Sequence, residues 1–360
     1  MRRSVRVGNR KIGSGERCYL IVEVGTTHLG VLEHALDMVD AAASAGVDAV
    51  KFQAIDPEQV SDPTATYTFR SGGQSFTMPM KEMFERLAFS HEQWATIAAA
   101  CRDRRVDFFA TVDSVDGVDM LERLGVPAHK IGAWDGTFRP LIERLGRTGK
   151  PVFCDLGPTT QEELDQLAEW FVGSGGRELL FFHDFHTSDH AQMNLRAIRY
   201  LNDNYPWPAG FSAPGRDHDL DMAALGLGAH FVEKRLILSR SDRAFHADES
   251  LEPDELKDWV RRIRNLERAL GEDAIRPSAE DRRQSRDYYR SVCTLRDVRA
   301  GEVFSPDNLG GKRPGTGLPT ARLREFWGRR AARNLDRDML LTLDDFSAEE
   351  VRVAEPADAA

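Results

Sequence analysis

Short apolar stretches alternate with helix-like stretches eight times in the first 271 residues of this 360-residue chain. The apolar stretches resemble strands that are buried on both faces of a parallel sheet, and apolar residues recur at helical spacing between them, as in 191–203. Eight successive strand–helix units predict a (β/α)₈ barrel, the TIM barrel of the α/β class. The predicted strands are residues 18–24, 47–52, 107–112, 128–132, 151–155, 178–183, 209–212 and 229–234.

The remaining pattern predicts a second domain. Residues 1–271 are expected to form the barrel, with a short N-terminal hairpin that plugs its bottom. Residues 272–287 are charge-dense and lack apolar periodicity, which favours a linker. Short strands, one of them at 297–304, then predict a small, mostly-β domain over residues 288–348. Residues 349–360 read as a tail.

Bulk composition excludes several functions. The formal net charge of −10 argues against nucleic-acid binding, because phosphate neutralisation requires a basic face. The four cysteines lack Cys-x-x-Cys spacing, so neither a zinc site nor a disulfide framework is indicated. No apolar run reaches membrane-spanning length, and no leader-like segment follows Met1. We therefore expect a cytoplasmic protein that acts on small molecules and binds neither nucleic acid nor membrane.

Polar side chains close the first two predicted strands. Glu23 ends the first, and Lys51 and Gln53 end the second, before a long polar loop. Barrels of this class carry their chemistry at the carboxyl ends of the strands. A lysine there can also simply extend its ammonium to solvent. The placement by itself leaves both interpretations open.

Eight segments together carry a resemblance. Seven lie in the barrel, and the eighth, Lys-Arg-Pro-Gly-Thr-Gly at 312–317, lies in the second domain. The barrel segments are 21–30 (Ile-Val-Glu-Val-Gly-Thr-Thr-His-Leu-Gly), 48–53, 130–132 (Lys-Ile-Gly), 149–151 (Gly-Lys-Pro), 194–195, 233–234 (Glu-Lys) and 250–253 (Ser-Leu-Glu-Pro). In this order they resemble the sialic acid synthase family, whose members join phosphoenolpyruvate to an acylated amino sugar. The second domain is similar to that family's antifreeze-like (SAF) domain.

The resemblance implies a role for each polar residue at the strand ends. Lys51 and Lys130 match the family's lysines, whose ammonium groups hold a phosphate and a carboxylate, as phosphoenolpyruvate requires. Ser212 matches a serine that helps bind the same ligand, and Gln53 would be a neighbouring donor. Glu23 matches the carboxylate near the reacting carbons and is expected to be the catalytic acid or base.

The resemblance also implies residues for the acceptor and a homodimer. Asp135 stands where the family has a glutamate in the sugar region and is taken as catalytic, while Lys234 is counted among the substrate-binding residues. In the family the second domain covers the partner's barrel, and the arginine matched by Arg313 touches the sugar's acyl group. The alternatives are an ion pair with a lysine for each carboxylate and a solvated loop arginine for Arg313.

The chain departs from the family at its metal site. The resemblance would place two histidine ligands where this chain has Pro214 and Arg235. Proline offers no side-chain lone pair and arginine stays protonated, so we expect no metal at these positions. The family's metal polarises the sugar aldehyde. Arg235 would replace that charge as a catalytic residue.

A second departure concerns Asp155 and residues 183–190. Asp155 replaces a phosphate-binding serine, and its carboxylate would repel phosphoenolpyruvate unless it is protonated or paired. His183, Asp184 and His186 could build, with Asp155, a divalent-metal site away from the family position, since His and Asp are good ligands for zinc, manganese or iron. Otherwise Asp155, His183 and His186 are expected to bind substrate, or the histidines belong to an ordinary exposed loop.

Three hypotheses follow. The first is a divergent sialic acid synthase-like enzyme that condenses phosphoenolpyruvate with an aldehyde to give a 2-keto-3-deoxy acid, with no certain cofactor. The second is the same scaffold recruited to another reaction on a sugar- or nucleoside-like molecule, using Asp155 and the 183–190 cluster. The third is a non-catalytic homologue, for which Trp134 or Phe185 would block the mouth. The acceptor is left open.

Overall fold

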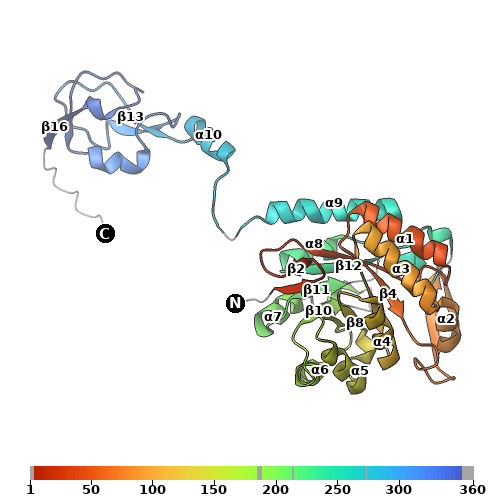
Figure 1. Cartoon of the computed structure of the whole chain (residues 1–360). Coiled ribbons are helices and arrows are strands. Elements are labelled where there is room, and N and C mark those ends of the chain that lie inside the picture. The colour runs from red at the N-terminus through yellow and green to blue at the C-terminus, as the bar shows by residue number, and fades with distance from the viewer. Residues whose placement is uncertain (1–3, 185–188, 213–214, 243, 273, 351–360) are drawn as a thin grey trace. The chain divides into compact units, whose positions relative to one another are not determined.

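The chain divides into two compact units, Met1–Gly271 and Glu272–Ala360, and each is described by itself. The computed structural model describes residues 4–184, 189–212, 215–242, 244–272 and 274–350 (Figure 1). Within these ranges no helix is both long and apolar enough to cross a membrane.

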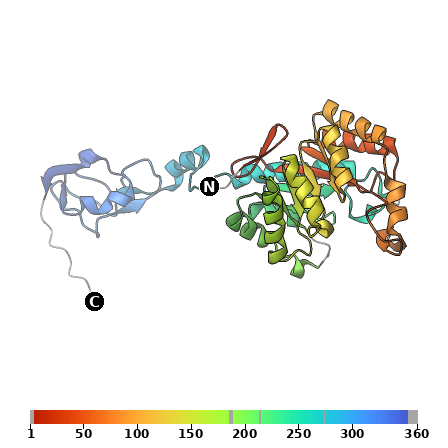
Figure 2. The ribbon, with the colours of Figure 1, turned by 60° about the horizontal axis from the view of Figure 1, so that its bottom comes forward.

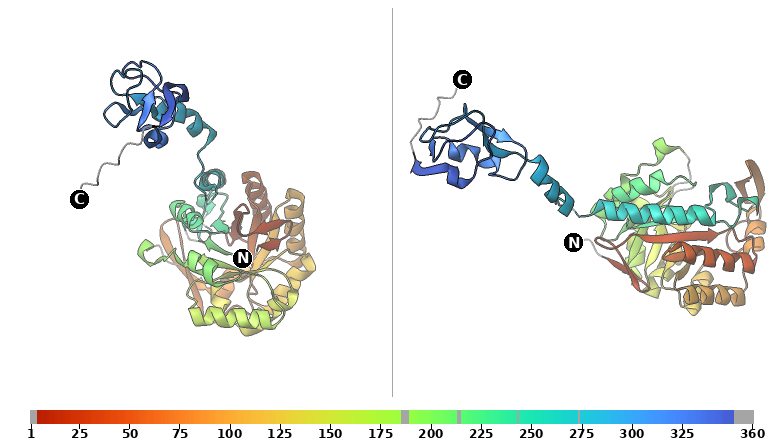
Figure 3. Two further views of the ribbon diagram at one scale, coloured as in Figure 1. Left: turned by 90° about the vertical axis from the view of Figure 1, so that its left-hand side faces the viewer. Right: turned by 90° about the horizontal axis from the view of Figure 1, so that it is seen from above.

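The first unit is a closed barrel of eight parallel strands, in the order β10-β11-β12-β3-β4-β7-β8-β9, which confirms the predicted TIM barrel. Helices ring the strands (Figures 2 and 3). The strands are β3 (Tyr19–Gly25), β4 (Ala49–Ala54), β7 (Asp107–Val112), β8 (His129–Ile131), β9 (Val152–Asp155), β10 (Leu179–Asp184), β11 (Ala209–Ser212) and β12 (Phe231–Arg235). The helices are α1 (Leu32–Ala45), α3 (His91–Arg104), α4 (Val115–Leu124), α5 (Arg139–Thr148), α6 (Gln161–Gly173), α7 (Ala197–Asn204), α8 (Asp219–Gly226) and α9 (Pro253–Leu270).

An N-terminal hairpin, β1 (Val5–Val7) and β2 (Arg10–Ile12), closes one end of the barrel, as its sequence predicts. Its apolar side chains join a buried cluster formed by the inward-facing residues of the lower barrel. That cluster contains Val5, Val7, Ile12, Tyr19, Ile21, Ala49, Phe109, Ala128, Phe153, Leu180, Phe182 and Phe231. The lower half of the lumen is therefore a packed apolar core.

Asp48 ties the hairpin to the barrel. Its carboxylate is 2% exposed and lies 2.9 Å from Arg10, 3.1 Å from Arg17 and 2.9 Å from Arg264. It also accepts the backbone N–H of Leu20 at 2.9 Å. Three arginines from three parts of the chain thus converge on one buried carboxylate.

The loop after β4 is more ordered than its polar sequence suggested. It holds a hairpin, β5 (Thr66–Ser71) and β6 (Gln74–Pro79), followed by helix α2 (Met80–Leu87). Gly72 and Gly73 both have positive φ and form its two-residue turn, a strong hairpin signal that our prediction of a loop overlooked.

The predicted helix 191–203 is shorter in the structure. Helix α7 begins only at Ala197, after a short 3₁₀ turn, η2 (His190–Gln192). Asn194 has φ of +38° and interrupts the helical path between the two. Asparagine tolerates this left-handed conformation better than most residues. The helical spacing of apolar residues therefore extends further towards the N-terminus than the helix itself.

The second unit contains two small antiparallel sheets. They pair β13 (Ser291–Thr294) with β14 (Leu309–Lys312) and β15 (Arg329–Ala331) with β16 (Phe346–Glu350). The predicted strand 297–304 is reduced to two isolated bridges, at Val298 and Val303. The apolar core of this unit consists of Val292, Val298, Phe304, Leu309, Phe326, Ala331, Leu335, Leu341 and Phe346.

Part of the predicted linker 272–287 is a helix, α10 (Ala279–Tyr288). Ser278 caps it, accepting the N–H of Asp281 while the Asp281 side chain accepts the N–H of Ser278. No residue of α10 is buried. An exposed helix needs no apolar stripe, which is why apolar periodicity did not reveal it.

We expect Asp48→Asn to lower the free energy of barrel unfolding by about 2–3 kcal/mol, because it weakens buried pairs on which three arginines depend. Urea denaturation followed by fluorescence measures this. Asp40→Asn is the matched control, since Asp40 forms an exposed pair with Arg104 and should change stability by less than about 1 kcal/mol. Equal effects of the two substitutions would contradict the role given to Asp48.

Candidate active site at the barrel mouth

A layer of polar side chains lies above the apolar core of the lumen. Alternate residues of a strand face the same side, so the residue two positions after each inward apolar one also faces the lumen. The barrel register pairs Glu23 with Lys51, and Asp184 with Ser212, which is paired in turn with Glu233. The layer, called the polar layer below, consists of Glu23, Lys51, Thr111, Lys130, Asp155, Asp184, Ser212 and Glu233.

Lys51 lies at one side of the polar layer and is only 2% exposed. Its ammonium is 2.9 Å from Glu23 Oε2 and 3.5 Å from Glu233 Oε1, and it donates to Thr111 Oγ1 at 3.3 Å. Gln53 lies beside it and donates from Nε2 to Glu23 Oε1 at 2.7 Å. A buried ammonium requires such partners, and the carboxylates supply them.

Lys130 is the second buried ammonium, 1% exposed. It lies 2.9 Å from Asp155, 3.0 Å from both oxygens of Glu233 and 4.3 Å from the centre of the Phe182 ring. Burial alone would lower the pKa of Lys130, but the surrounding carboxylates raise it above its usual value. Glu233 connects both lysines, so the two predicted phosphate-binding groups form one charge cluster.

Asp155 faces this cluster with a carboxylate that is hard to ionise. Burial raises its pKa to about 6 against the attraction of Lys130, and the nearby charge of Asp184 adds to the rise. Burial likewise raises the pKa of Asp184, which accepts the backbone N–H of Gly157. Both carboxylic acids hold a proton more readily than an exposed one would.

Arg235 is the last residue of β12, two residues after Glu233, and the barrel register pairs it with Glu23. Its guanidinium is 3.7 Å from Glu23 and, through another nitrogen, 3.7 Å from Glu249. Burial would raise the pKa of Glu23, but Lys51, Arg235 and Lys130 together hold it well below its usual range. Glu23 is therefore a carboxylate at neutral pH, in the ionisation state that a base requires.

When every carboxyl is counted as ionised, the charges of this region do not balance. Among the described residues of the polar layer and Arg235, four carboxylates face three cations, a formal charge of −1. The lysines are thus already neutralised by the protein. An anionic ligand must displace this pairing or arrive with protonation of a carboxylate.

The structure separates Lys234 from the polar layer. Lys234 points outward, where it lies 3.1 Å from Asp221 of α8 and donates to the carbonyls of Gly215 and Asp217. It stabilises the loop after β11 instead of facing a substrate, which corrects the substrate-binding role given to it. Asp135 lies in the turn after β8; burial and the charge of Asp113 raise its pKa to about 6.

The residues proposed for a relocated metal site are only partly described. His183 donates from Nε2 to the carbonyl of Met193 at 3.0 Å, while Asp184 faces the lumen. His186, Pro214 and Phe185 lie outside the described residues. In the described part of the chain, no three His, Cys, Asp or Glu side chains lie close enough together to hold a metal ion.

Two further predicted positions are placed by the structure. Trp134 is 70% exposed, so its ring does not fill the lumen as the non-catalytic hypothesis required. Arg313 belongs to the second unit, where its Nε donates to the carbonyl of Tyr288 at 2.6 Å. This contact is within its own unit and leaves the dimer role untested.

Several residues of the site were not predicted from sequence. Glu233 was noted only as part of a Glu-Lys motif, although a glutamate in the middle of a buried strand is itself a signal. Thr111 and Glu249 carry no such signal, because only the folded barrel brings them to Lys51 and Arg235.

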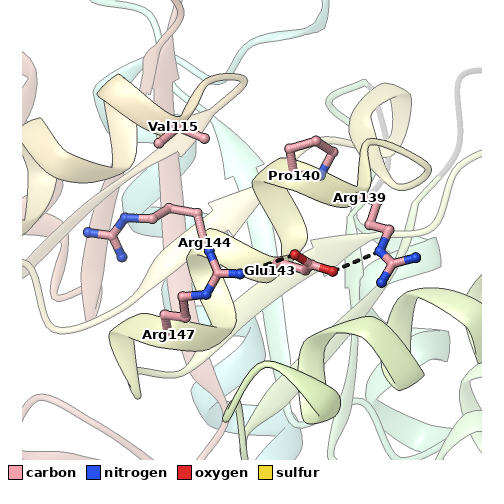
Figure 4. Close-up of a pocket in the computed structure, with 6 residues that line it drawn as sticks. All are labelled: Val115, Arg139, Pro140, Glu143, Arg144 and Arg147. Atoms are coloured by element: carbon pink, nitrogen blue, oxygen red, sulfur yellow. Dashed lines mark hydrogen bonds and ion pairs between the residues drawn. The ribbon is translucent and has the colours of Figure 1, made fainter.

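Two surface hollows are found in the described part of the barrel. One of about 230 Å³ lies beside Gln53 and is lined by residues of β4, of α2, α3 and α4, and of the loops between them. The other, of about 460 Å³, lies on the outside of the barrel and includes no residue of the polar layer (Figure 4). It is lined by Val115, Arg139, Pro140, Glu143, Arg144 and Arg147. Arg139 and Arg147 are exposed and pair with Glu143, while the half-buried Arg144 pairs with Asp119, so the hollow is a groove on the helix surface.

Comparison with known families assigns the chain to a protein family. The sequence model of the NeuB family matches residues 38–274, and that of the SAF domain matches residues 289–347. The chain belongs to the NeuB family.

Relatives of this NeuB-family chain include sugar acid synthases. The N,N'-diacetyllegionaminic acid synthase of Campylobacter jejuni is 26% identical over 91% of this chain and 99% of its own length. The human N-acetylneuraminate-9-phosphate synthase is 28% identical over 73% and 74%. The structure of N-acetylneuraminic acid synthetase from Leptospira borgpetersenii superposes with a TM-score of 0.70 at 25% identity, covering 79% of this chain and 95% of that one.

We expect the stability of the barrel to depend on the charge of Asp155. Because its folded pKa is raised, the folded state holds the proton longer, and stability is lost as pH rises from about 4 through about 6, by up to about 3 kcal/mol. Asp155→Asn removes this dependence. Urea unfolding of the wild type and of Asp155→Asn at several pH values measures this dependence. If the free energies of unfolding of the two proteins changed with pH in parallel, the raised pKa of Asp155 would be refuted.

Proposed function

We propose that this NeuB-family chain condenses phosphoenolpyruvate with the aldehyde form of an acylated amino sugar. The new carbon–carbon bond joins the terminal methylene carbon of the donor to the aldehyde carbon. The aldehyde oxygen becomes a hydroxyl, water adds to the donor's second carbon, and inorganic phosphate leaves. The product is a 2-keto-3-deoxy acid. The named relatives, which are synthases of sialic-acid-type sugars, support this reaction class.

The observation that carries the proposal is the pair of buried ammonium groups at the barrel mouth. Lys51 and Lys130 are both nearly inaccessible, yet they lie where barrels bind substrate, bridged by Glu233. Two fixed cations match a ligand that carries a phosphate and a carboxylate. Ser212 and Gln53 add neutral hydrogen-bonding groups, and the ionised Glu23 is placed to accept a proton.

The reaction proposed here uses no metal at the family positions. Pro214 and Arg235 do not fit a cation, because neither side chain offers a lone pair. The guanidinium of Arg235, beside Glu23, supplies a positive charge for the developing alkoxide instead. A divalent ion bound by His183, Asp184 and His186 remains a separate proposal, since His186 is outside the described residues.

The second candidate function keeps the scaffold but changes the donor. The observation that favours it is Asp155, whose carboxylate pairs with Lys130 at 2.9 Å where a phosphate would otherwise bind. A neutral or less charged sugar- or nucleoside-like ligand would leave that pair intact. Binding of phosphoenolpyruvate requires that the ion pair between Lys130 and Asp155 opens or that Asp155 is protonated.

Calorimetric titration with phosphoenolpyruvate separates the two candidates. We expect Lys51→Met to weaken binding by about 100-fold, because it removes a charge-assisted contact and frees two carboxylates. Asp155→Ser should strengthen binding by about tenfold, since a repelling charge is removed. Lys150→Met is the matched control, because Lys150 pairs with Glu122 before β9 begins, and should leave affinity unchanged. No binding by wild type or Asp155→Ser would rule out this donor.

Phosphate release tests the role of Arg235. The acceptor probe is N-acetylmannosamine, the aldehyde left when the pyruvate carbons are removed from N-acetylneuraminate. We expect Arg235→Gln to lower kcat by about 100-fold or more, with a smaller loss in Arg235→Lys, while EDTA leaves wild-type activity unchanged. Loss of activity with EDTA and recovery with manganese would contradict the metal-free proposal.

We further propose that the chain works as a homodimer in which Arg313 reaches the acyl group of a sugar bound to the partner barrel. The support is the family resemblance of the 312–317 segment and the SAF match. Light scattering should give twice the mass of one chain at micromolar concentration. Arg313→Ala should raise KM for the acceptor without changing the affinity for phosphoenolpyruvate, and a monomer with full activity would contradict both expectations.

A further inference from the structure

The β5–β6 hairpin is seated on the segment 244–249, which follows β12. The rings of Phe69 and Phe245 meet edge to face with centroids 4.4 Å apart. At the hairpin turn, the backbone N–H groups of Gly72 and Gly73 donate to Asp248 at 3.0 and 3.1 Å. The hairpin and this segment therefore form one packed structure.

His246 lies at the centre of that structure in an unusual conformation. Its φ of 60° and ψ of 21° are left-handed, a conformation that is strained for a residue other than glycine. Both ring nitrogens have partners: Nε2 lies 2.8 Å from the Tyr67 hydroxyl, and Nδ1 lies 3.5 Å from Glu249 Oε2. The surrounding contacts hold the ring despite the backbone strain.

These contacts continue to the barrel mouth. Glu249 Oε2, which faces His246, is also 3.7 Å from a guanidinium nitrogen of Arg235, and Arg235 is 3.7 Å from Glu23. The side chain of Glu249 is 42% exposed. An exposed carboxylate holds an arginine more firmly when further contacts fix its position. His246, which is itself held by Tyr67, contributes such a contact.

We propose that His246, held by Tyr67, is a positioning residue that acts through Glu249 to fix the guanidinium of Arg235 beside Glu23. This role rests on the function proposed for Arg235. It makes the hairpin a working part of the site, because Tyr67 on β5 sets the orientation of the ring. Neither Tyr67 nor His246 need touch the substrate.

The groups that face His246 give the contact a spectroscopic signature. Burial lowers the pKa of its imidazole, and the charge of Arg235 lowers it further, while Glu249 and Glu23 raise it. Tyr67 adds its hydrogen bond from the hairpin. If the chain of contacts exists in solution, removing either charged neighbour must shift the imidazole titration.

The first test is NMR titration of histidine-labelled protein without substrate. We expect the His246 titration to move to higher pH in Arg235→Gln and to lower pH in Glu249→Gln. Asp248→Asn is the matched control, because Asp248 lies on the same turn and binds the hairpin backbone, so the titration should not shift. An unchanged titration in Arg235→Gln overturns the proposal.

The second test is kinetic, with phosphoenolpyruvate and N-acetylmannosamine as probes. We expect Tyr67→Phe and Glu249→Gln to lower kcat by about tenfold, with the KM for phosphoenolpyruvate within about twofold and the melting temperature unchanged. Asp248→Asn should retain kcat. Equal losses in Asp248→Asn would show that only hairpin docking matters and would overturn the proposal. If phosphoenolpyruvate did not bind the wild type, only the proposed function would be refuted. The NMR titration would then decide whether His246 has the proposed role.

Discussion

Two lysine ammonium groups buried in the lumen of the barrel determine the arrangement of everything around them. A buried charge without partners is too costly to keep, so Lys51 and Lys130 require carboxylates within a few ångströms. Glu233 meets both lysines, Glu23 meets the first and Asp155 the second. The same pairing that permits the lysines to be buried also reduces the positive charge available to a ligand. The chemistry at the barrel mouth depends on how a substrate changes these ion pairs.

Two residues that the family resemblance singles out, Asp155 and Arg235, contribute to that balance. Asp155 adds a negative charge next to Lys130, and Arg235 adds a positive one next to Glu23. Each new charge thus has an opposite partner in the polar layer, so both can be accommodated without unpaired burial. What remains is a site with its cations already engaged, in contrast to an open anion hole. A donor with several negative charges can bind there only by rearranging ion pairs or by bringing protons with it.

The barrel could be predicted because its strands are continuous apolar runs and its helices keep their spacing, which are local signals. Much of the polar layer could also be predicted from the sequence, since charged residues at the ends of buried strands are rare enough to be noticed. Lys234 was assigned wrongly because its neighbour was ignored: adjacent strand residues face opposite sides, and Glu233 already faces the lumen. The contact between Arg235 and Glu249 joins separate elements, so no local pattern contains it.

The same distinction applies to the hairpin on which the mouth depends. Its turn, Gly72-Gly73, is a local signal that was present and not used. Its function is not local, because Tyr67 matters only through His246, which lies far along the chain. The left-handed backbone of His246 could not be located from the sequence, because only a few per cent of non-glycine residues adopt it, although histidine does so more often than most. Strain of this kind becomes visible only in the fold.

The carboxylates at the barrel mouth outnumber its cations, and the number of protons exchanged on binding measures this directly. Phosphoenolpyruvate is titrated into the protein at pH 7 in two buffers of different ionisation enthalpy, and the difference in observed heat gives the number of protons exchanged. We expect an uptake of about one proton per donor bound, because a carboxylic acid with a raised pKa accepts it. Binding with no proton exchange would mean that the lysines are free to receive the anion, and would contradict the charge arrangement described for this site.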